Sequence, residues 1–293
     1  MNPTAELTVR LAAFAGVLAV MAIWELAAPR RPWSVGRSAR WPSNLGIVVI
    51  DAVAVRLLIP TAAVGTALLA QARGFGLFHW LGWPTFVAGL VGFVILDLVI
   101  YAQHVAFHHV PWLWRLHRVH HADLDVDVTT GVRFHPIEIL LSMLIKIAVV
   151  ALFGIPAAAV IAFEVALNAT AMFNHANVAL PAAIDRFARL VVVTPDMHRV
   201  HHSVERRETD SNFGFNLPWW DRLFGTYRAA PAAGHDEMRI GLPVFRAARE
   251  LCLDRLLTQP FRAPADAVDA APDTAPNTAP DTAPMGAGEV RRS

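Results

Sequence analysis

The chain has 293 residues, a net charge of +1 and a hydrophobic content of 55%. Its mean hydropathy of +0.42 is too high for an ordinary soluble protein, and its near-neutral charge gives no sign of a surface that binds nucleic acid. One cysteine, Cys252, excludes a disulfide framework and a thiolate metal site. The composition therefore predicts an integral membrane protein that binds no nucleic acid.

Apolar stretches of membrane-spanning length occupy most of the first 173 residues. A membrane helix needs about 20 predominantly apolar residues. We predict an all-α bundle of four to five spans in two hairpins, with a cytoplasmic, histidine-rich helical cap. The predicted spans are Leu7–Ala28, Asn44–Ala70, Thr85–Gln103, Ile137–Phe153 and Ala157–Phe173.

The orientation follows from the basic residues after the first span. Arg30, Arg31, Arg37 and Arg40 form a cluster there, and such clusters stay in the cytoplasm by the positive-inside rule. The amino terminus is therefore expected outside and the carboxyl end of the third span inside. Two spans separate the later histidines from the earlier ones, so all of them are expected on one face of the membrane.

Eight histidines fall into three groups with helical spacing. Residues three and four apart share one face of a helix, so each group can direct its imidazoles to one point. Neutral imidazole is the commonest side-chain ligand of transition metals. Eight ligands are too many for one ion, whereas a histidine pH switch needs only one or two, so the pattern predicts two metal ions. The groups are His104 and His108; His117, His120 and His121; and His198, His201 and His202.

Asp97 and Tyr101 lie on the helical stripe that leads to the first group. They precede His104 by seven and three residues. A histidine that binds a metal usually donates its other N–H to a carboxylate or a carbonyl. We therefore single out Asp97 and Tyr101 as candidate catalytic residues that support the ligands. The alternative is a buried ion pair between Asp97 and Arg56.

Four further segments complete the chain. Asp123–Thr130 is acidic and polar, and we expect a solvated loop. Pro181–Val193 is typical of an amphipathic segment on the surface, and Asp210–Tyr227 of an aromatic lid packed on the site. We divide the chain into a membrane hairpin (1–80), a catalytic region (81–230), a cytoplasmic segment (231–262) and a tail (263–293). The tail repeats Ala, Pro, Thr and Asp and is expected to be disordered.

The histidine motifs together resemble those of the fatty acid hydroxylase/sterol desaturase superfamily, in particular its bacterial members. The resemblance covers roughly Phe86–Arg228 and is specific in order, spacing and flanking residues. The motifs that carry it are H-V-A-F-H, H-R-V-H-H, R-F-H-P-I-E, F-N-H-A-N, T-P-D-M-H-R-V-H-H-S and N-F-G-F-N-L-P-W-W-D-R-L-F-G-T-Y.

The resemblance implies a membrane enzyme with two non-haem iron ions that uses O2 and two electrons to hydroxylate or desaturate a lipid. Its site would face the cytoplasm, in a bacterial inner membrane. By position, the eight histidines would be ligands, together with His175. His135 matches a histidine of some branches only. Some members have another histidine where this chain has Ala171, so His135 is a candidate for the tenth ligand.

The resemblance also implies partners. The substrate would be a sterol, a fatty acyl chain or a related lipid from the bilayer. The chain contains no cytochrome b5-like or flavin-binding module, so electrons would come from a separate protein or reductase. Two other classes stay open: a membrane metal transporter and a zinc-dependent membrane hydrolase. A transporter would have ligands at mid-membrane depth, and a zinc hydrolase needs only three protein ligands.

Overall fold

The computed structural model describes residues 3–263, and helices dominate this part of the chain. Between these residues no β-strand forms, and the only extended pairings are two isolated bridges, Pro29 with Val178 and Ser203 with Ile240. The predicted all-α fold is confirmed. Apart from Ala263, the tail predicted to be disordered lies outside the described residues.

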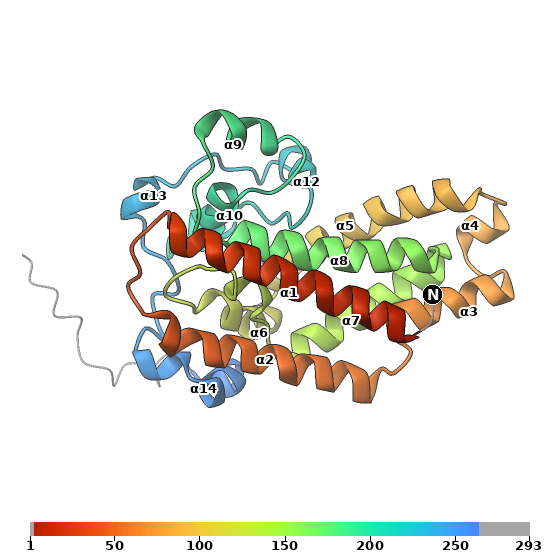
Figure 1. Ribbon diagram of the computed structural model, residues 1–293, viewed down its shortest axis with the longest axis horizontal. Coiled ribbons are helices and arrows are strands. Elements are labelled where there is room, and N and C mark those ends of the chain that lie inside the picture. The colour runs from red at the N-terminus through yellow and green to blue at the C-terminus, as the bar shows by residue number, and fades with distance from the viewer. Residues whose placement is uncertain (1–2, 264–293) are drawn as a thin grey trace, which may run out of the picture.

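Five segments of the bundle are long and apolar enough to cross a membrane. Figure 1 shows α1, α5 and α8 running along the long axis toward the cap, while α2 and α7 run away from it. The ends of α5 and α8 and the start of α7 therefore meet at one end of the bundle. The bundle consists of α1 (Pro3–Ala27), α2 (Arg37–Leu58), α3 (Ala62–Arg73), α4 (Leu77–Trp80), α5 (Thr85–His109), α7 (Pro136–Phe153) and α8 (Ala157–His175).

The second predicted span is wrong in one respect. We expected one helix over Asn44–Ala70, but α2 ends at Leu58 and α3 begins at Ala62. Pro60 lies at the break. Proline has no backbone N–H to continue the helical ladder, and it disfavours a helical conformation in the residue before it. The segment therefore kinks, and α3 packs against α7 and α8.

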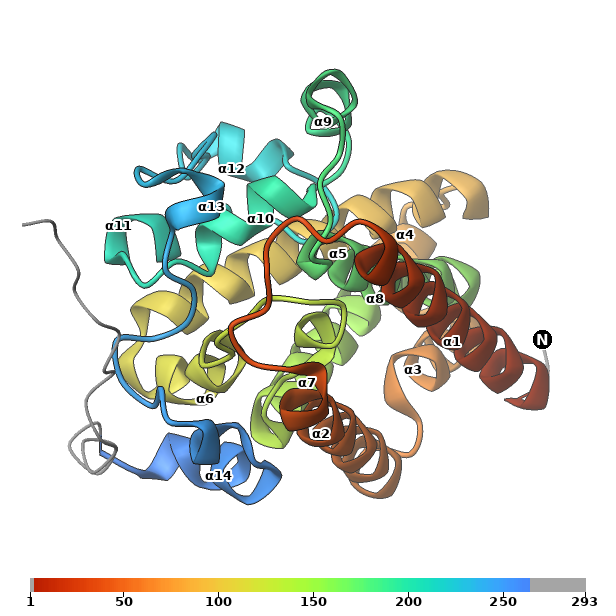
Figure 2. The ribbon, with the colours of Figure 1, turned by 60° about the vertical axis from the view of Figure 1, so that its left-hand side comes forward.

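Short helices build the cap beside the histidine-bearing end of the bundle. Figure 2 shows α6 below the end of α5, and α10 with its neighbours above α5. The cap comprises α6 (Pro111–His121), η1 (Thr130–Val132), α9 (Ala182–Ala188), α10 (Pro195–His201), α11 (Arg206–Thr209), α12 (Trp219–Leu223), α13 (Gly234–Glu237), η2 (Ala248–Leu251), α14 (Leu253–Thr258) and η3 (Gln259–Phe261).

Three charged side chains inside the membrane helices pair with one another. Glu164 on α8 accepts hydrogen bonds from Lys146 on α7, at 2.7 Å, and from Arg10 on α1, at 2.6 Å. An unpaired charge in hydrocarbon is expensive, so such residues face partners within the bundle. This cluster ties α1 and α7 to α8.

The acidic segment after α6 is buried, contrary to the solvated loop that we expected. Asp123 and Asp127 have no exposed surface. Arg40 on α2 donates to Asp123 at 3.0 Å and also pairs with Asp127. Burial alone would raise the pKa of Asp123, but Arg40 and Arg133 lower it below the ordinary value. This network fixes the segment between α6 and α7, and with it the position of both helices.

Candidate metal centre

Nine histidines from four helices and their ends gather in one region at the end of the bundle. They lie on the C-terminal turns of α5, α6 and α8, on the short helix α10, and at His202, which caps the end of α10. Thr194 begins α10, because its side-chain oxygen accepts the backbone N–H of Met197 at 3.4 Å. Each of the nine is at most 3% exposed. A buried group of this size needs partners, because every unpaired imidazole nitrogen costs free energy.

In space the nine histidines form two groups, which differ from the three groups along the sequence. The five-histidine group has candidate ligand atoms that all lie within 4.8 Å of one another. The Nε2 atoms of His104 and His117 are 3.0 Å apart. Nε2 of His108, Nε2 of His201 and both ring nitrogens of His121 have no hydrogen-bond partner. The group is His104, His108, His117, His121 and His201.

The second group has four members and centres on His175. Its Nε2 atom lies 3.1 Å from the Nε2 atoms of His120, His198 and His202. One nitrogen has at most one proton, so hydrogen bonds cannot satisfy three such neighbours. Two nitrogens bound at right angles, each about 2.1 Å from one ion, lie about 3.0 Å apart. The spacing therefore fits ligands that surround a metal ion.

The opposite ring nitrogens are held by acceptors outside the two groups. Nδ1 of His117 donates to Glu138 at 2.7 Å, and Nδ1 of His108 donates to Asp210 at 3.2 Å. Four more histidines donate Nδ1–H to backbone carbonyls: His104 to Phe213, His120 to Arg133, His175 to Ala171 and His201 to Ser211. Metal-binding histidines show this arrangement, which presents an unprotonated Nε2 to the ion.

The two groups differ in their supporting acceptors. Both carboxylates, Glu138 and Asp210, support members of the five-histidine group. His120 and His175 of the four-histidine group donate to neutral carbonyls, and Nδ1 of His198 and of His202 has no partner. A carboxylate makes an imidazole more basic. The five-histidine group therefore offers more ligands and more negative charge to a cation.

Burial keeps the cap imidazoles in the form that binds metal. It lowers the pKa of His117 to about 3. Burial, and then neighbouring imidazoles, also lower the pKa of His120, His121, His198, His201 and His202 well below the ordinary value. These side chains are neutral at pH 7, and neutral imidazole is the ligand form of histidine.

Comparison with known families identifies the part of the chain that builds this centre. A family model described as fatty acid hydroxylase matches residues 89–226, which include all nine clustered histidines. Residues 89–226 of this chain resemble the fatty acid hydroxylase family. The resemblance that the histidine motifs showed is thereby confirmed.

Relatives of known activity oxidise lipids. The ornithine lipid hydroxylase OlsE of Rhizobium tropici is 30% identical over 61% of this chain and 56% of its own length. Human alkylglycerol monooxygenase is 30% identical over 54% of this chain and 34% of its own length. Rat cholesterol 25-hydroxylase is 26% identical over 48% of this chain and 47% of its own length. The chain thus spans about half or less of each relative, and no solved structure gives a significant match.

One histidine of the resemblance lies apart from the two groups. His135 precedes α7, and its Nδ1 accepts the backbone N–H of Ile137 at 3.2 Å. Its Nε2 lies 3.2 Å from the carbonyl oxygen of Leu257. Both ring nitrogens are thus engaged at the start of the helix. The structure does not bring His135, our candidate for a tenth ligand, to the histidine centre.

Asp97 and Tyr101 also contact other groups than we expected. Asp97 accepts hydrogen bonds from Asn216 and from the indole N–H of Trp220, each at 2.8 Å, so it pairs with neither Tyr101 nor Arg56. The hydroxyl of Tyr101 lies 2.9 Å from Oγ1 of Thr226. Both residues anchor the segment after α11, the predicted aromatic lid, to α5. They lie beside the histidine centre, and neither forms a hydrogen bond with an imidazole.

The supporting carboxylates were not predicted. Glu138 belongs to the motif R-F-H-P-I-E, and Asp210 opens the aromatic segment. Their pairing with His117 and His108 depends on helix packing. The motif could have indicated Glu138, because it places a glutamate three residues after a histidine, in the first turn of a membrane helix. A carboxylate buried there costs free energy unless it has a partner, and a metal-binding histidine is such a partner.

Aromatic rings close the histidine centre on the side of the membrane bundle. Phe134 stacks on His120 with ring centroids 4.4 Å apart, and Phe215 lies 4.9 Å from His104. Both phenylalanines also pack in the apolar core formed by α3, α5, α7 and α8. The hydrocarbon-like interior of the bundle therefore reaches the imidazoles at these two rings.

Proposed function

We propose that this protein is a non-haem di-iron monooxygenase that hydroxylates a lipid of the membrane in which it is embedded. The observation that carries the proposal is the pair of buried histidine groups, with five and four members. Two ions with four to six ligands each need a set of this size. The lipid-oxidising relatives support the reaction class and the kind of substrate.

Bound iron would supply the activation of O2 and the abstraction of hydrogen from an unactivated C–H bond, which no side chain performs alone. The protein's residues supply orientation. Glu138, Asp210 and the four carbonyl acceptors hold the rings so that unprotonated nitrogens face inward. Burial of the whole set excludes bulk water from the reacting atoms.

The substrate carbon would approach along the apolar side of the centre. Phe134 and Phe215 provide a surface there that favours an acyl or sterol chain over a polar molecule. A lipid from the bilayer can reach this surface without leaving an apolar environment. We place the centre on the cytoplasmic face of a bacterial inner membrane, because the arginines after α1 lie at the same end as the histidines. A separate protein or reductase on that face would donate the electrons.

Metal analysis of the purified full chain tests the dinuclear centre. Protein produced with added iron should contain about two metal ions per chain, and His120→Ala together with His198→Ala should remove the ion of the four-histidine group only. Elemental analysis that finds one ion or none in folded wild-type protein would contradict the proposal. Retention of zinc under iron-rich conditions, with no O2 uptake on addition of lipid and reductant, would favour the zinc hydrolase.

A further inference from the structure

Helix α9 and the turn that follows it expose an apolar face beside the membrane bundle. Ile184, Phe187 and Val191 are 56, 63 and 60% exposed, and Leu190 is 54% exposed. No residue of α9 is buried. Figures 1 and 2 both show α9 at the outer edge of the cap. A soluble surface rarely presents such a cluster without a partner.

Helix α12 extends this apolar surface and fixes its orientation. Leu223 and Phe224 are 69 and 57% exposed. The indole N–H of Trp219 donates to the carbonyl of Leu190 at 2.7 Å, and Arg222 donates to the carbonyl of Arg189 at 3.0 Å. These bonds satisfy the free carbonyls at the end of α9. The two short helices therefore form one unit, which we call the α9–α12 ledge (residues 182–191 and 219–224).

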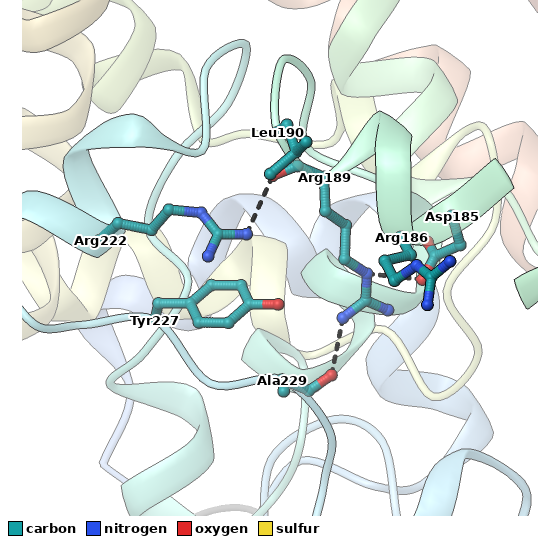
Figure 3. Close-up of a pocket in the computed structure, with 7 residues that line it drawn as sticks. All are labelled: Asp185, Arg186, Arg189, Leu190, Arg222, Tyr227 and Ala229. Atoms are coloured by element: carbon teal, nitrogen blue, oxygen red, sulfur yellow. Dashed lines mark hydrogen bonds and ion pairs between the residues drawn. The ribbon is translucent and has the colours of Figure 1, made fainter. Parts of the chain in front are cut away.

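A basic pocket of about 500 Å³ lies between the two helices of the ledge. Three arginines and one carboxylate line it, so its net charge is positive. Figure 3 shows the Tyr227 hydroxyl pointing into the space beside the Arg189 guanidinium. The lining residues are Asp185, Arg186, Arg189, Leu190, Arg222, Tyr227 and Ala229.

The hydrogen bonds within the pocket leave donors for an anion. Arg189 is occupied, since it lies 2.6 Å from Asp185 and donates to the carbonyl of Ala229 at 2.7 Å. The other oxygen of Asp185 accepts the hydroxyl of Thr194 at 2.6 Å. Arg222 packs over the ring of Tyr227 at 4.2 Å, and Arg186 is exposed at the rim. A guanidinium presents several N–H groups in a plane, which suits a phosphate.

We propose that the α9–α12 ledge lies in the headgroup layer of the membrane and that its pocket binds the phosphate of an anionic phospholipid. Six residues separate α9 from the membrane helix α8, so the ledge stays close to the bilayer surface. A helix with apolar residues on one face and arginines on the other is typical of that layer. A soluble phosphate compound would explain the arginines but not the exposed leucine and phenylalanine side chains next to them.

Spin-label accessibility tests the position of the ledge. A nitroxide is attached at Phe187→Cys in a Cys252→Ser background, with the full chain in lipid nanodiscs. The label should be accessible to O2 and shielded from a water-soluble nickel chelate. Arg207→Cys, on the exposed surface of α11, is the control and should show the reverse. Equal access of the nickel chelate to both labels would overturn the membrane position.

Lipid binding tests the pocket separately and needs no enzymatic activity. The apparent affinity for phosphatidylglycerol, measured by thermal shift in detergent, should fall roughly tenfold in Arg186→Gln with Arg222→Gln, because two charge-assisted hydrogen bonds are lost. Arg186→Gln alone changes only an exposed side chain and should give part of the loss without affecting folding. Arg207→Gln should bind as wild type. Equal shifts with phosphatidylcholine, or binding of inorganic phosphate that phosphatidylglycerol cannot displace, would overturn the lipid site.

Discussion

Replacement of Glu138 by glutamine should weaken metal binding by the five-histidine group roughly 10–100-fold, the usual effect of losing a carboxylate that supports a ligand. This corresponds to about 1.4–2.7 kcal/mol of binding free energy. Glu138 accepts the Nδ1–H of His117 at 2.7 Å, and its other oxygen has no partner. Glutamine keeps one acceptor oxygen and the side-chain volume, removes the charge, and places an amide NH2 group where the unpartnered oxygen was.

The fold of the apoprotein should tolerate this change, because burial of an ionised carboxylate costs more free energy than burial of a neutral amide. Glu138 is 4% exposed. The assay is anaerobic titration of apoprotein with Co²⁺, followed by visible absorption and checked by elemental analysis. Wild type should fill the five-histidine group before the four-histidine group, and Glu138→Gln should bring the two affinities closer together.

Glu208→Gln is the matched control for this experiment. Glu208 is also 4% exposed, but its carboxylate accepts the backbone N–H of Ala232, at 2.6 Å. It should leave both metal affinities unchanged. The reasoning would be refuted if Glu138→Gln bound both ions as tightly as wild type, or if both variants lost metal equally.

Three further predictions follow from the structure. The thermal midpoint of the apoprotein in detergent should fall as the pH drops below about 6.5. Burial lowers the pKa of His117 to about 3 in the folded chain, so below about pH 6.5 the unfolded chain binds more protons than the folded chain. A midpoint that stays constant down to about pH 4 would contradict this. Asp97→Asn should lower the free energy of unfolding by about 1–3 kcal/mol, because one of the buried donors of Asn216 and Trp220 loses its acceptor, and it should leave the metal content unchanged. Loss of metal without loss of stability would instead indicate that Asp97 supports a ligand. In a Cys252→Ser background, Arg207→Cys should be labelled only from the cytoplasm and Leu81→Cys only from the periplasm, and the opposite result would invert the topology.

The spacing of the histidines predicted much of the site, because a helix brings residues three and four apart onto one face. It could not predict how the histidines divide between the groups. The structure pairs residues four apart, such as His117 with His121, and sends His120 to the other group. Adjacent positions on a helix point about 100° apart, so the histidines of one motif belong to both groups. That division depends on how α5, α6, α8 and α10 cross.

The predictions that were wrong concern positions that are decided by tertiary contacts. The acidic segment around Asp123 has the composition of a loop, and only Arg40, far away in the sequence, explains its burial. His135 has a motif neighbour in Glu138, yet the direction of α7 turns the two side chains to different partners. Pro60 is the exception, since its position alone was enough to predict the break between α2 and α3.

Oxygen-isotope labelling of membrane lipids tests the proposed activity most directly. Cells that express the wild-type chain are grown under isotopically labelled O2 and compared with cells that express His120→Ala, and the extracted lipids are analysed by mass spectrometry. We predict a lipid that gains one labelled oxygen atom in the wild type and none in the variant. Lipids that are identical in the two strains, from cells in which the wild-type protein is folded and loaded with iron, would contradict the account.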